Sequence, residues 1–399
     1  MVSHCVERPR VDIIRAKIQQ ATRLLDEMNI DAWALFERET AMQKDPTHDM
    51  VVGLEAVWNS LFLFTRRGDA IALVGNFDED GFARSGRFIR VQSYVKGIGE
   101  DIEKLLQEVD PRTLALNYSV DDCASDGLTH GMFLLLQSYL AGTPYAERII
   151  SSQPFLSKLR SRKLPEEIVR LERAAVLATE AWAKAGERIQ VGMTEREIGA
   201  IIDTEITNVG GEPSFETIVN AGTKTNPGHG RPTDARLDPG ELLHVDFGIR
   251  IDDYCSDLQR LVYFRRTGES QPPHELTEAF ETVKTIISKT AEAARPGVKG
   301  FEVDALARRL LHENGYPEYE HALGHQLGRD VHDGGGLLGP QWERYGNTPL
   351  MPIEVGNVFT LELEIVLPGI GCVGLEEDVV VTEHGARFLC DRQTELLIK

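Results

Sequence analysis

The stretch Leu242–Phe264, LLHVDFGIRIDDYCSDLQRLVYF, carries aspartates inside β-branched and aromatic runs that are typical of strands. Asp252 and Asp253 at its centre are a turn signal, although a weaker one than Asn-Gly. If these two residues form a hairpin turn, Ile251 pairs with Tyr254, and that pairing fixes the register of both strands. The stretch therefore predicts an antiparallel hairpin with carboxylates on its strands.

In this register Gly248 faces Asp257, and Asp246 is a diagonal neighbour of Asp257 on one face of the hairpin. Diagonal β-carbons lie roughly 7 Å apart, so two short carboxylates at this spacing can converge on one or two cations. The alternative interpretation is an edge strand whose charges prevent aggregation. The two aspartates alone leave both possibilities open, and the choice depends on residues further along the chain.

The composition is that of a globular protein of two domains, with 399 residues, 42% apolar content and no dominant bias. The 63 acidic and 43 basic residues give a net charge of −20, which argues against binding to nucleic acid or to an anionic membrane. We find no apolar run long enough to span a bilayer and no apolar core of a signal peptide near the N-terminus. We therefore expect neither a membrane-bound nor a secreted protein.

The cysteines are odd in number, widely scattered and without CxxC spacing; they are Cys5, Cys123, Cys255, Cys372 and Cys390. This pattern indicates neither a disulfide framework nor a thiolate zinc site. A reducing compartment suits such a chain best, so we expect a cytoplasmic protein.

An α/β domain is expected over residues 1–155. Apolar residues in Pro9–Asn29 follow helical spacing, and Ala32–Phe36 is typical of a buried strand. Further short apolar runs are separated by helical segments such as Gly99–Val109, which favours alternating strands and helices. These runs are Ser60–Thr65, Ala70–Val74, Thr113–Leu116 and Arg148–Ile150. The polar, proline-containing segment Glu39–Gly53 has no clear periodicity and is expected to be a long surface loop.

A second domain is expected over residues 156–399. A strongly helical run with Pro165 in its first turn predicts its first long helix. Thr194 and Glu197 form a capping-box pattern that opens a second helix, which extends through Ile206. Two more helices and a closing pair of strands are expected at Glu269–Arg295, Glu302–Asn314, Val358–Val366 and Val373–Val381.

Three of the chain's 11 histidines, His321, His325 and His332, lie within twelve residues. A lone buried histidine is usually a core residue with satisfied hydrogen bonds, but a cluster in a glycine-broken loop favours a functional site. We expect Gly324 and Gly328 to allow close approach of the backbone in this loop.

Glutamates recur with strand periodicity after the histidine cluster. Glu362 and Glu364 share one face of a predicted strand by period two, and Glu376 lies on the strand predicted to pair with it. These glutamates are therefore expected to form a second group of neighbouring carboxylates, after the pair Asp246 and Asp257.

In this order and setting, the residues resemble the metal ligands of the pita-bread metallopeptidases, a family that includes Xaa-Pro dipeptidase (prolidase), aminopeptidase P, methionine aminopeptidase and creatinase-type enzymes. The resemblance is carried by HVDFG and SDLQR around the two aspartates, HALGHQLGRDVHD at 321–333, FTLE at 359–362 and GLEEDVVVTEHG at 374–385. It implies an α+β protein with a creatinase-like α/β N-terminal cap domain followed by a C-terminal pita-bread domain. The cap favours the prolidase, aminopeptidase P and creatinase branch.

The resemblance further implies a ligand set for two divalent metal ions, made of Asp246, Asp257, His325, Glu362 and Glu376, with Asp257 and Glu376 bridging. Four carboxylates and one imidazole suit Mn²⁺ best, with Co²⁺ or Zn²⁺ as alternatives. Two ions held in this way lower the pKa of a shared water molecule. By resemblance, Glu362 also acts as a general base. His229 and His332 bind substrate and assist proton transfer and stabilisation of the tetrahedral intermediate, and His321 contacts substrate.

The chain departs from the family pattern at three places. Gly374 replaces the arginine that usually lies two residues before the last metal glutamate. Gln259 stands in place of the usual threonine after the second aspartate. The usual Glu-Pro-Gly is absent after the other glutamate, since Leu363 and Glu364 follow Glu362. A cation for a substrate carboxylate then has to come from elsewhere. The candidates are Arg329, or Lys44 or His48 from the Glu39–Gly53 loop of a neighbouring subunit.

The first functional hypothesis is a cytoplasmic, homodimeric Xaa-Pro dipeptidase that cleaves the bond before proline in small peptides. One alternative within the fold is aminopeptidase P, which accepts longer peptides. Others are a creatinase- or ectoine-hydrolase-type enzyme that opens a non-peptide C–N bond, and a catalytically silent binding protein. The complete ligand set favours the first hypothesis, because enzymes of the non-peptide type tend to replace these ligands.

Overall fold

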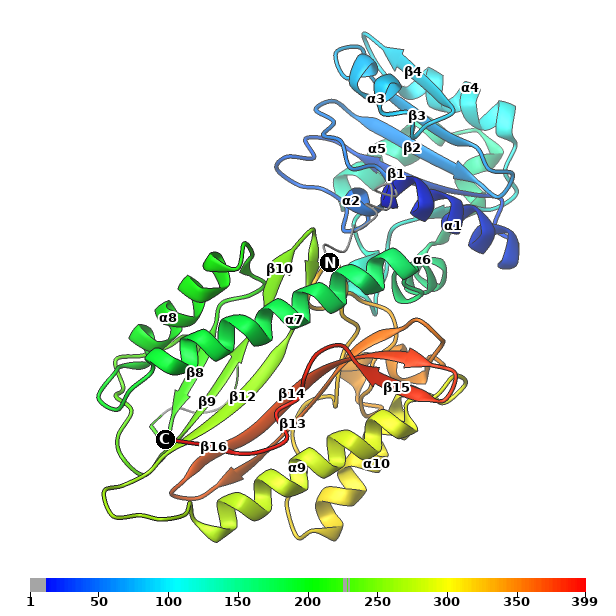
Figure 1. Ribbon diagram of the computed structural model, residues 1–399. Coiled ribbons are helices and arrows are strands. Elements are labelled where there is room, and N and C mark those ends of the chain that lie inside the picture. Colours follow the sequence, from blue (N-terminus) through cyan, green and yellow to red (C-terminus); the bar gives the residue numbers. More distant parts are fainter. Residues whose placement is uncertain (1–11, 225–227, 229) are drawn as a thin grey trace, which may run out of the picture. The chain divides into compact units, whose positions relative to one another are not determined.

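The computed structural model describes residues 12–224, 228 and 230–399 (Figure 1). It divides into two compact units, Met1–Leu159 and Arg160–Lys399, close to the expected boundary between residues 155 and 156. Among the described residues, no helix is both long and apolar enough to cross a membrane.

The first unit is built on a six-stranded sheet with the order β4-β3-β2-β1-β5-β6. Its strands are β1 Ala32–Glu37, β2 Ser60–Thr65, β3 Ala70–Gly75, β4 Arg90–Tyr94, β5 Leu114–Leu116 and β6 Ile149–Ser151. Its helices are α1 Ile13–Glu27, α2 His48–Val51, α3 Glu79–Ser85, α4 Gly99–Val109 and α5 His130–Leu140, and α6 Gln153–Ser161 follows at the boundary between the units. Alternating residues of β1 and β2 enter two separate cores, one shared with α1 and the other with α4 and α5, so both faces of the sheet are covered.

The expected alternation of strands and helices is only partly correct in this unit. β1, β2 and β3 form a consecutive antiparallel run, in which β2 and β3 are joined by a four-residue turn, Arg66–Asp69. Parallel pairing begins only with β3–β4, β1–β5 and β5–β6. Apolar runs buried on both faces read alike in parallel and antiparallel sheets, so the sequence pattern did not separate the two arrangements.

The segment Glu39–Gly53, expected to be a surface loop, is anchored in this unit. It contains the short helix α2, and the His48 side chain is buried, with Nδ1 2.7 Å from Glu37 Oε1 and Nε2 2.9 Å from the Leu54 carbonyl. The candidate role of His48 as a cation for a bound substrate is therefore wrong, because its ring is enclosed by its own unit. Lys44 is ion-paired with Asp49.

The second unit carries a seven-stranded, mainly antiparallel sheet with the order β13-β14-β12-β9-β8, in which β15 pairs with β14 and β16 with β12. Its strands are β8 Ile218–Ala221, β9 Glu241–Phe247, β12 Leu258–Phe264, β13 Val358–Leu367, β14 Gly371–Thr382, β15 Gly385–Phe388 and β16 Leu397–Ile398. Its helices are α7 Pro165–Arg188, α8 Glu195–Asn208, α9 His274–Ala293 and α10 Gly300–Glu313, and all four lie near their predicted positions. A small sheet, β11-β10-β7, consists of Tyr254–Cys255, Ile249–Ile251 and Glu212–Pro213.

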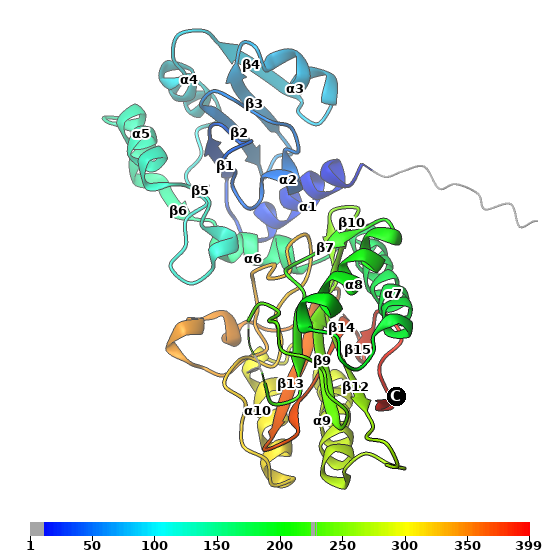
Figure 2. The ribbon, with the colours of Figure 1, turned by 90° about the vertical axis from the view of Figure 1, so that its left-hand side faces the viewer.

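The helices α9 and α10 pack against the apolar face of β13. In β13, Leu361, Leu363 and Ile365 join the core that includes residues of α9 and α10, whereas Glu362 and Glu364 alternate with them and face the other way. The pair α7 and α8 packs in the same manner at the β8 and β9 end of the sheet, through a second core (Figures 1 and 2). In β13 and β14, Glu362, Glu364 and Glu376 therefore lie on the face opposite the core residues Leu361, Leu363 and Leu375.

The register predicted for the Leu242–Phe264 hairpin is confirmed. Ile251 pairs with Tyr254, and both turn residues have left-handed backbone conformations, with φ of 51° at Asp252 and 67° at Asp253, as a type I′ turn requires. The sequence did not reveal that the hairpin is shared between two sheets. Its tip belongs to the small sheet and its base, β9 and β12, to the large one.

Candidate metal centre

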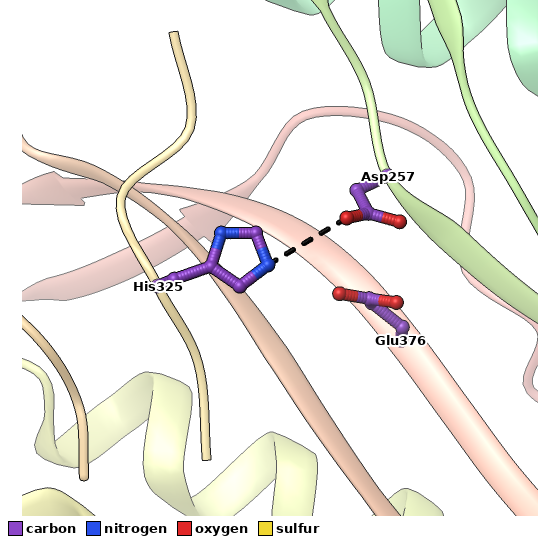
Figure 3. A group of neighbouring side chains, drawn as sticks. All are labelled: Asp257, His325 and Glu376. Carbon is purple, nitrogen blue, oxygen red and sulfur yellow. Dashed lines mark ion pairs between the residues drawn. The ribbon is translucent and has the colours of Figure 1, made fainter. Parts of the chain in front are cut away.

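Asp257, His325 and Glu376 form the centre of the polar face, where one ligand atom from each lies within 4.8 Å of the others (Figure 3). His325 Nε2 is 3.6 Å from Asp257 Oδ2. Asp257 immediately precedes β12, Glu376 lies in β14, and His325 comes from the segment between α10 and β13. Three distant parts of the chain thus supply a compact group of potential metal ligands.

The strand register places two further carboxylates, Asp246 and Glu362, in line with the central group across the sheet. These five residues, Asp246, Asp257, His325, Glu362 and Glu376, are called the ligand row below. Gln259 pairs with Asp246 on one side and with Glu376 on the other, and Glu362 lies directly opposite Glu376. Directly paired residues of an antiparallel sheet share a face. Asp246 and Glu362 therefore flank the central group from β9 and β13.

Backbone hydrogen bonds along β13 position His325. Residues 323–327 lie beside this strand, with Thr360 N donating to the His325 carbonyl at 3.0 Å. A Cβ at Gly324 would lie 1.9 Å from the Thr360 carbonyl oxygen, and one at Gly328 would lie 2.1 Å from Asp333 Oδ2. The close backbone approach predicted for both glycines is confirmed.

The buried carboxylates repel one another. The pKa of Asp246 is raised well above its usual value, first by burial and then by the negative charges of Asp257 and Glu376. The pKa of Glu362 is raised in the same way, by burial and then by the charges of its carboxylate neighbours. Burial lowers the pKa of His325, which favours the neutral imidazole that a metal ion requires.

Several carboxylate oxygens at this site have no donor. Asp246 Oδ1, Asp257 Oδ1 and Glu376 Oε1 are buried and have no hydrogen-bond partner among the described residues. Unpaired buried carboxylate oxygens are costly unless they are paired with cations. The donor set of several carboxylate oxygens and one imidazole nitrogen fits divalent first-row ions.

A buried ion-pair cluster that the sequence pattern did not predict holds the loop that carries His332. Arg160 Nη2 and Lys163 Nζ lie 2.7 Å and 2.6 Å from the carboxylate of Asp333, and Arg160 Nε also donates to the Asp333 carbonyl. Burial alone would raise the pKa of Asp333, but the two positive charges hold it below its usual value. The three basic residues of the stretch Leu159–Pro165 were the available signal.

His332 and His321 lie beside the central group in different settings. The rings of His332 and His325 meet edge to face, with centroids 4.4 Å apart, and His332 is exposed. His321 faces two acceptors, since Nδ1 is 2.7 Å from the Ala322 carbonyl and Nε2 is 2.6 Å from Glu364 Oε2. Burial alone would lower the pKa of His321, but the bond to Glu364 raises it. His229 lies outside the described residues.

An acidic residue, Glu364, lies next to these ligands on β13. Glu364 lies directly opposite Gly374, the position at which the family usually has its arginine. The guanidinium of Arg329, the other cation considered for a substrate carboxylate, is 3.3 Å from Asp253 Oδ2 and lies over the Tyr254 ring.

Comparison with protein-family models identifies residues 169–383 as a match to metallopeptidase family M24. Because this match covers more than half of the chain, the protein belongs to metallopeptidase family M24. The resemblance inferred from the sequence motifs is confirmed.

Among curated relatives, an Xaa-Pro dipeptidase of Pyrococcus furiosus is 33% identical over 244 residues, which cover 61% of this chain and 66% of the relative. An Xaa-Pro dipeptidase of Lactobacillus helveticus is also 33% identical, over 65% of this chain and 68% of the relative. The match to the first relative thus spans just under two thirds of its length.

Solved structures share the whole architecture. A prolidase from Pyrococcus horikoshii superimposes with a TM-score of 0.72 at 26% identity, over 96% of this chain and all of that one. An Xaa-Pro dipeptidase from Bacillus anthracis has a TM-score of 0.76 at 23% identity, over 97% of this chain and 100% of that one. The predicted α+β fold, with an N-terminal domain followed by a pita-bread domain, is confirmed.

Proposed function

We propose that this protein is a metal-dependent Xaa-Pro dipeptidase that hydrolyses the peptide bond before proline. One observation carries the proposal. Buried carboxylate oxygens that accept no hydrogen bond from the described residues lie next to the His325 imidazole, whose pKa is lowered by burial. The two curated relatives described above, both named Xaa-Pro dipeptidase, support the same substrate class.

Two divalent ions are the proposed cofactors, held by Asp246, Asp257, His325, Glu362 and Glu376. Mn²⁺ is the favoured ion, because oxygen-rich sites suit it better than they suit structural zinc. When bound, such ions lower the pKa of a water molecule and polarise the scissile carbonyl. Asp257 and Glu376, central in the row, are the proposed bridging ligands.

The remaining site residues are proposed to handle protons and substrate. Glu362 accepts a proton from the attacking water, as a general base. His332, exposed beside His325, donates to the negative charge that develops on the carbonyl oxygen of the substrate. His321 contacts the substrate while Glu364 holds its ring, and His229 is proposed to bind substrate and to assist in proton transfer to the leaving amine.

We further propose a cytoplasmic homodimer. The described cysteines, Cys123, Cys255, Cys372 and Cys390, are all free, which suits a reducing compartment. The homodimer is proposed by analogy with the family alone, and size-exclusion chromatography with light scattering measures it.

The first test is an assay of chelator-stripped protein on Ala-Pro, Leu-Pro and a tripeptide with proline second, with Mn²⁺, Co²⁺ or Zn²⁺ added back and bound metal counted in parallel. We expect cleavage of the dipeptides to return with Mn²⁺ and with two bound ions per chain. Cleavage of the tripeptide as well would reassign the protein to the aminopeptidase P class. If the protein neither binds added metal nor cleaves any of these peptides, the proposal is contradicted.

Adjacent glutamates on β14 provide a matched pair of variants. We expect Glu376→Gln to reduce metal affinity and kcat/KM by at least about 100-fold, since even outer partners of metal ligands contribute roughly 10- to 100-fold. Glu377, whose Oε2 is 3.1 Å from Arg260 Nη2, is equally buried but alternates to the other face of the strand. Glu377→Gln should therefore retain two bound ions. Equal metal loss in both variants would show that the ligand assignment is wrong.

The second candidate function is that of an aminopeptidase acting on longer peptides. It is favoured by Glu364, which lies opposite Gly374, because an acid next to the ligand row disfavours the free carboxylate of a dipeptide. The tripeptide arm of the same assay separates the two functions.

A further inference from the structure

A buried chain of polar side chains ends on the proposed metal ligand Glu376. Asn220 Nδ2 is 3.1 Å from His244 Nδ1, His244 Nε2 is 2.9 Å from Gln259 Oε1, and Gln259 Nε2 is 3.0 Å from Glu376 Oε2. All four side chains are more than nine-tenths buried. None of the first three is among the proposed ligands or catalytic residues.

The carboxylate fixes the direction of every hydrogen bond in this chain. A carboxylate that binds metal can only accept, so the Gln259 amide donates its N–H to Glu376 and turns its oxygen toward His244. His244 must then carry its proton on Nε2, and its bare Nδ1 accepts from the Asn220 amide.

The hydrogen bond to Oε2 uses one lone pair of that oxygen, so both oxygens of Glu376 still offer a lone pair to a cation, as a bridging ligand requires. Gln259 donates to Oε2 at 3.0 Å, and Oε1 is the buried oxygen with no partner among the described residues. Fixing one oxygen restricts rotation of the carboxylate about its last torsion, so Oε1 is aimed before any ion arrives.

The unusual glycine at position 374 makes room for this chain. A Cβ at Gly374 would lie 2.8 Å from Gln259 Oε1 and 2.9 Å from His244 Nε2, which is closer than real Cβ contacts allow. Any side chain at this position would push against both atoms of the central hydrogen bond. Two departures from the family pattern, Gly374 and Gln259, are thus parts of one local arrangement.

We propose that His244 and Gln259 are positioning residues that orient Glu376 for the metal centre, and that Gly374 is the space they require. This inference rests on the proposed function, because it assumes that Glu376 binds a metal ion. The proposal also means that Gly374 helps to position the metal ligand Glu376 and does not contact the substrate.

Gln259→Met tests the link that touches the ligand, with the Mn²⁺ dissociation constant of stripped protein measured by calorimetry. Methionine keeps the length of the side chain and removes its hydrogen bonds, so we expect Mn²⁺ to bind about 10- to 100-fold more weakly. Gln393→Met is the control, because Gln393 is equally buried, with 7% exposure, and bonds instead to the backbone of Leu261. It should lower thermal stability and leave metal affinity unchanged.

His244 is tested by a conservative pair. His244→Gln retains a donor near the position of Nε2 and should keep Mn²⁺ affinity within a few-fold of the wild type. His244→Leu retains bulk without a donor and should lose about 10-fold or more. If His244 only filled space, the leucine variant would bind Mn²⁺ as well as the glutamine variant does.

Gly374→Ala should weaken Mn²⁺ binding to a similar extent. Because it acts on the same hydrogen bond, its effect should not add to that of Gln259→Met in the double variant. Additive losses, or wild-type affinity in both single variants, would overturn the inference. A wild-type protein that binds no metal would instead overturn the proposed function, so the two failures are distinguishable.

Discussion

At the scale of single residues, each unit contains a buried charged group with partners in its own unit. In the second unit, Asp333 lies between Arg160 and Lys163 beside the candidate site. In the first unit, both ring nitrogens of His48 face acceptors, Glu37 Oε1 and the Leu54 carbonyl. Burial alone would lower the pKa of His48, but the hydrogen bond and the charge of Glu37 raise it. The folded state therefore binds the His48 proton more tightly than the unfolded chain does.

This pair predicts the pH dependence of stability in the first unit. A raised folded-state pKa contributes stability that is complete below the unfolded pKa of about 6.5 and is lost as pH rises through the higher folded value. We expect the difference in unfolding free energy between wild type and His48→Gln to be largest near pH 5.5 and to shrink toward pH 9. Native-state hydrogen exchange of the β1 amides measures it. His130→Gln, at an exposed histidine of the same unit, should show no such trend.

The identity of the candidate ligands could be predicted from their neighbours in sequence, whereas their buried partners could not. The sequence places Glu362 and Glu376 beside turn and strand signals that fix which face they occupy. The hydrogen bond between Gln259 and Glu376 depends on the register of two strands far apart in the chain, and local patterns carry no information about that register. His244 in the strand β9 is likewise indistinguishable in sequence from an ordinary core histidine.

At the scale of elements, the start of α8 follows its capping residues closely. α8 begins at Glu195, directly after Thr194, whose Oγ1 accepts from Glu197 N at 3.2 Å while Glu197 Oε2 accepts from Thr194 N at 2.8 Å. The capping box predicted from sequence is confirmed. α2 could not be predicted in the same way, because its four residues are held by tertiary contacts of His48 rather than by a cap.

The cap gives a prediction for α8. Thr194→Ala should lower the unfolding free energy of the second unit by about 1 kcal/mol, the usual contribution of an N-cap side chain. Urea denaturation monitored by far-ultraviolet circular dichroism measures the change. Thr207→Ala, at an exposed position in the last turn of the same helix, should change it by less than about 0.5 kcal/mol. An equal effect in both variants would exclude a capping contribution.

At the scale of the whole molecule, the proposed chemistry belongs to one unit. The ligand row and the hydrogen-bond chain that ends on Glu376 lie within Arg160–Lys399, and the first unit has its own two cores. The sequence predicted a boundary near this point from the strongly helical run that begins at Pro165. It could not indicate how tightly the Glu39–Gly53 segment is held, because that depends on contacts with residues as distant as Asn117.

Metal binding should therefore protect the two units unequally. A ligand at 100 times its dissociation constant stabilises the folded state by about 2.7 kcal/mol. When Mn²⁺ is added to stripped protein, we expect the amides of β12, β13 and β14 to exchange more slowly, by up to about 100-fold, and those of β1, β2 and β3 to change little. Hydrogen exchange with mass spectrometry measures both regions at once. In Glu376→Gln protein the same addition should have no effect, and a wild-type β14 that gains no protection would contradict the prediction.

The arrangement of the ligand row also has a consequence for the order of folding. Two of its carboxylates belong to the β9–β12 hairpin and two to the β13–β14 hairpin, each of which pairs residues that are close in sequence. The hairpins meet where Gln259 pairs with Glu376, across more than one hundred residues of intervening chain. Local hairpins form early and such distant pairings late. A nascent chain with both hairpins complete therefore carries all four carboxylate ligands, but as two separate pairs that the late pairing must still bring together.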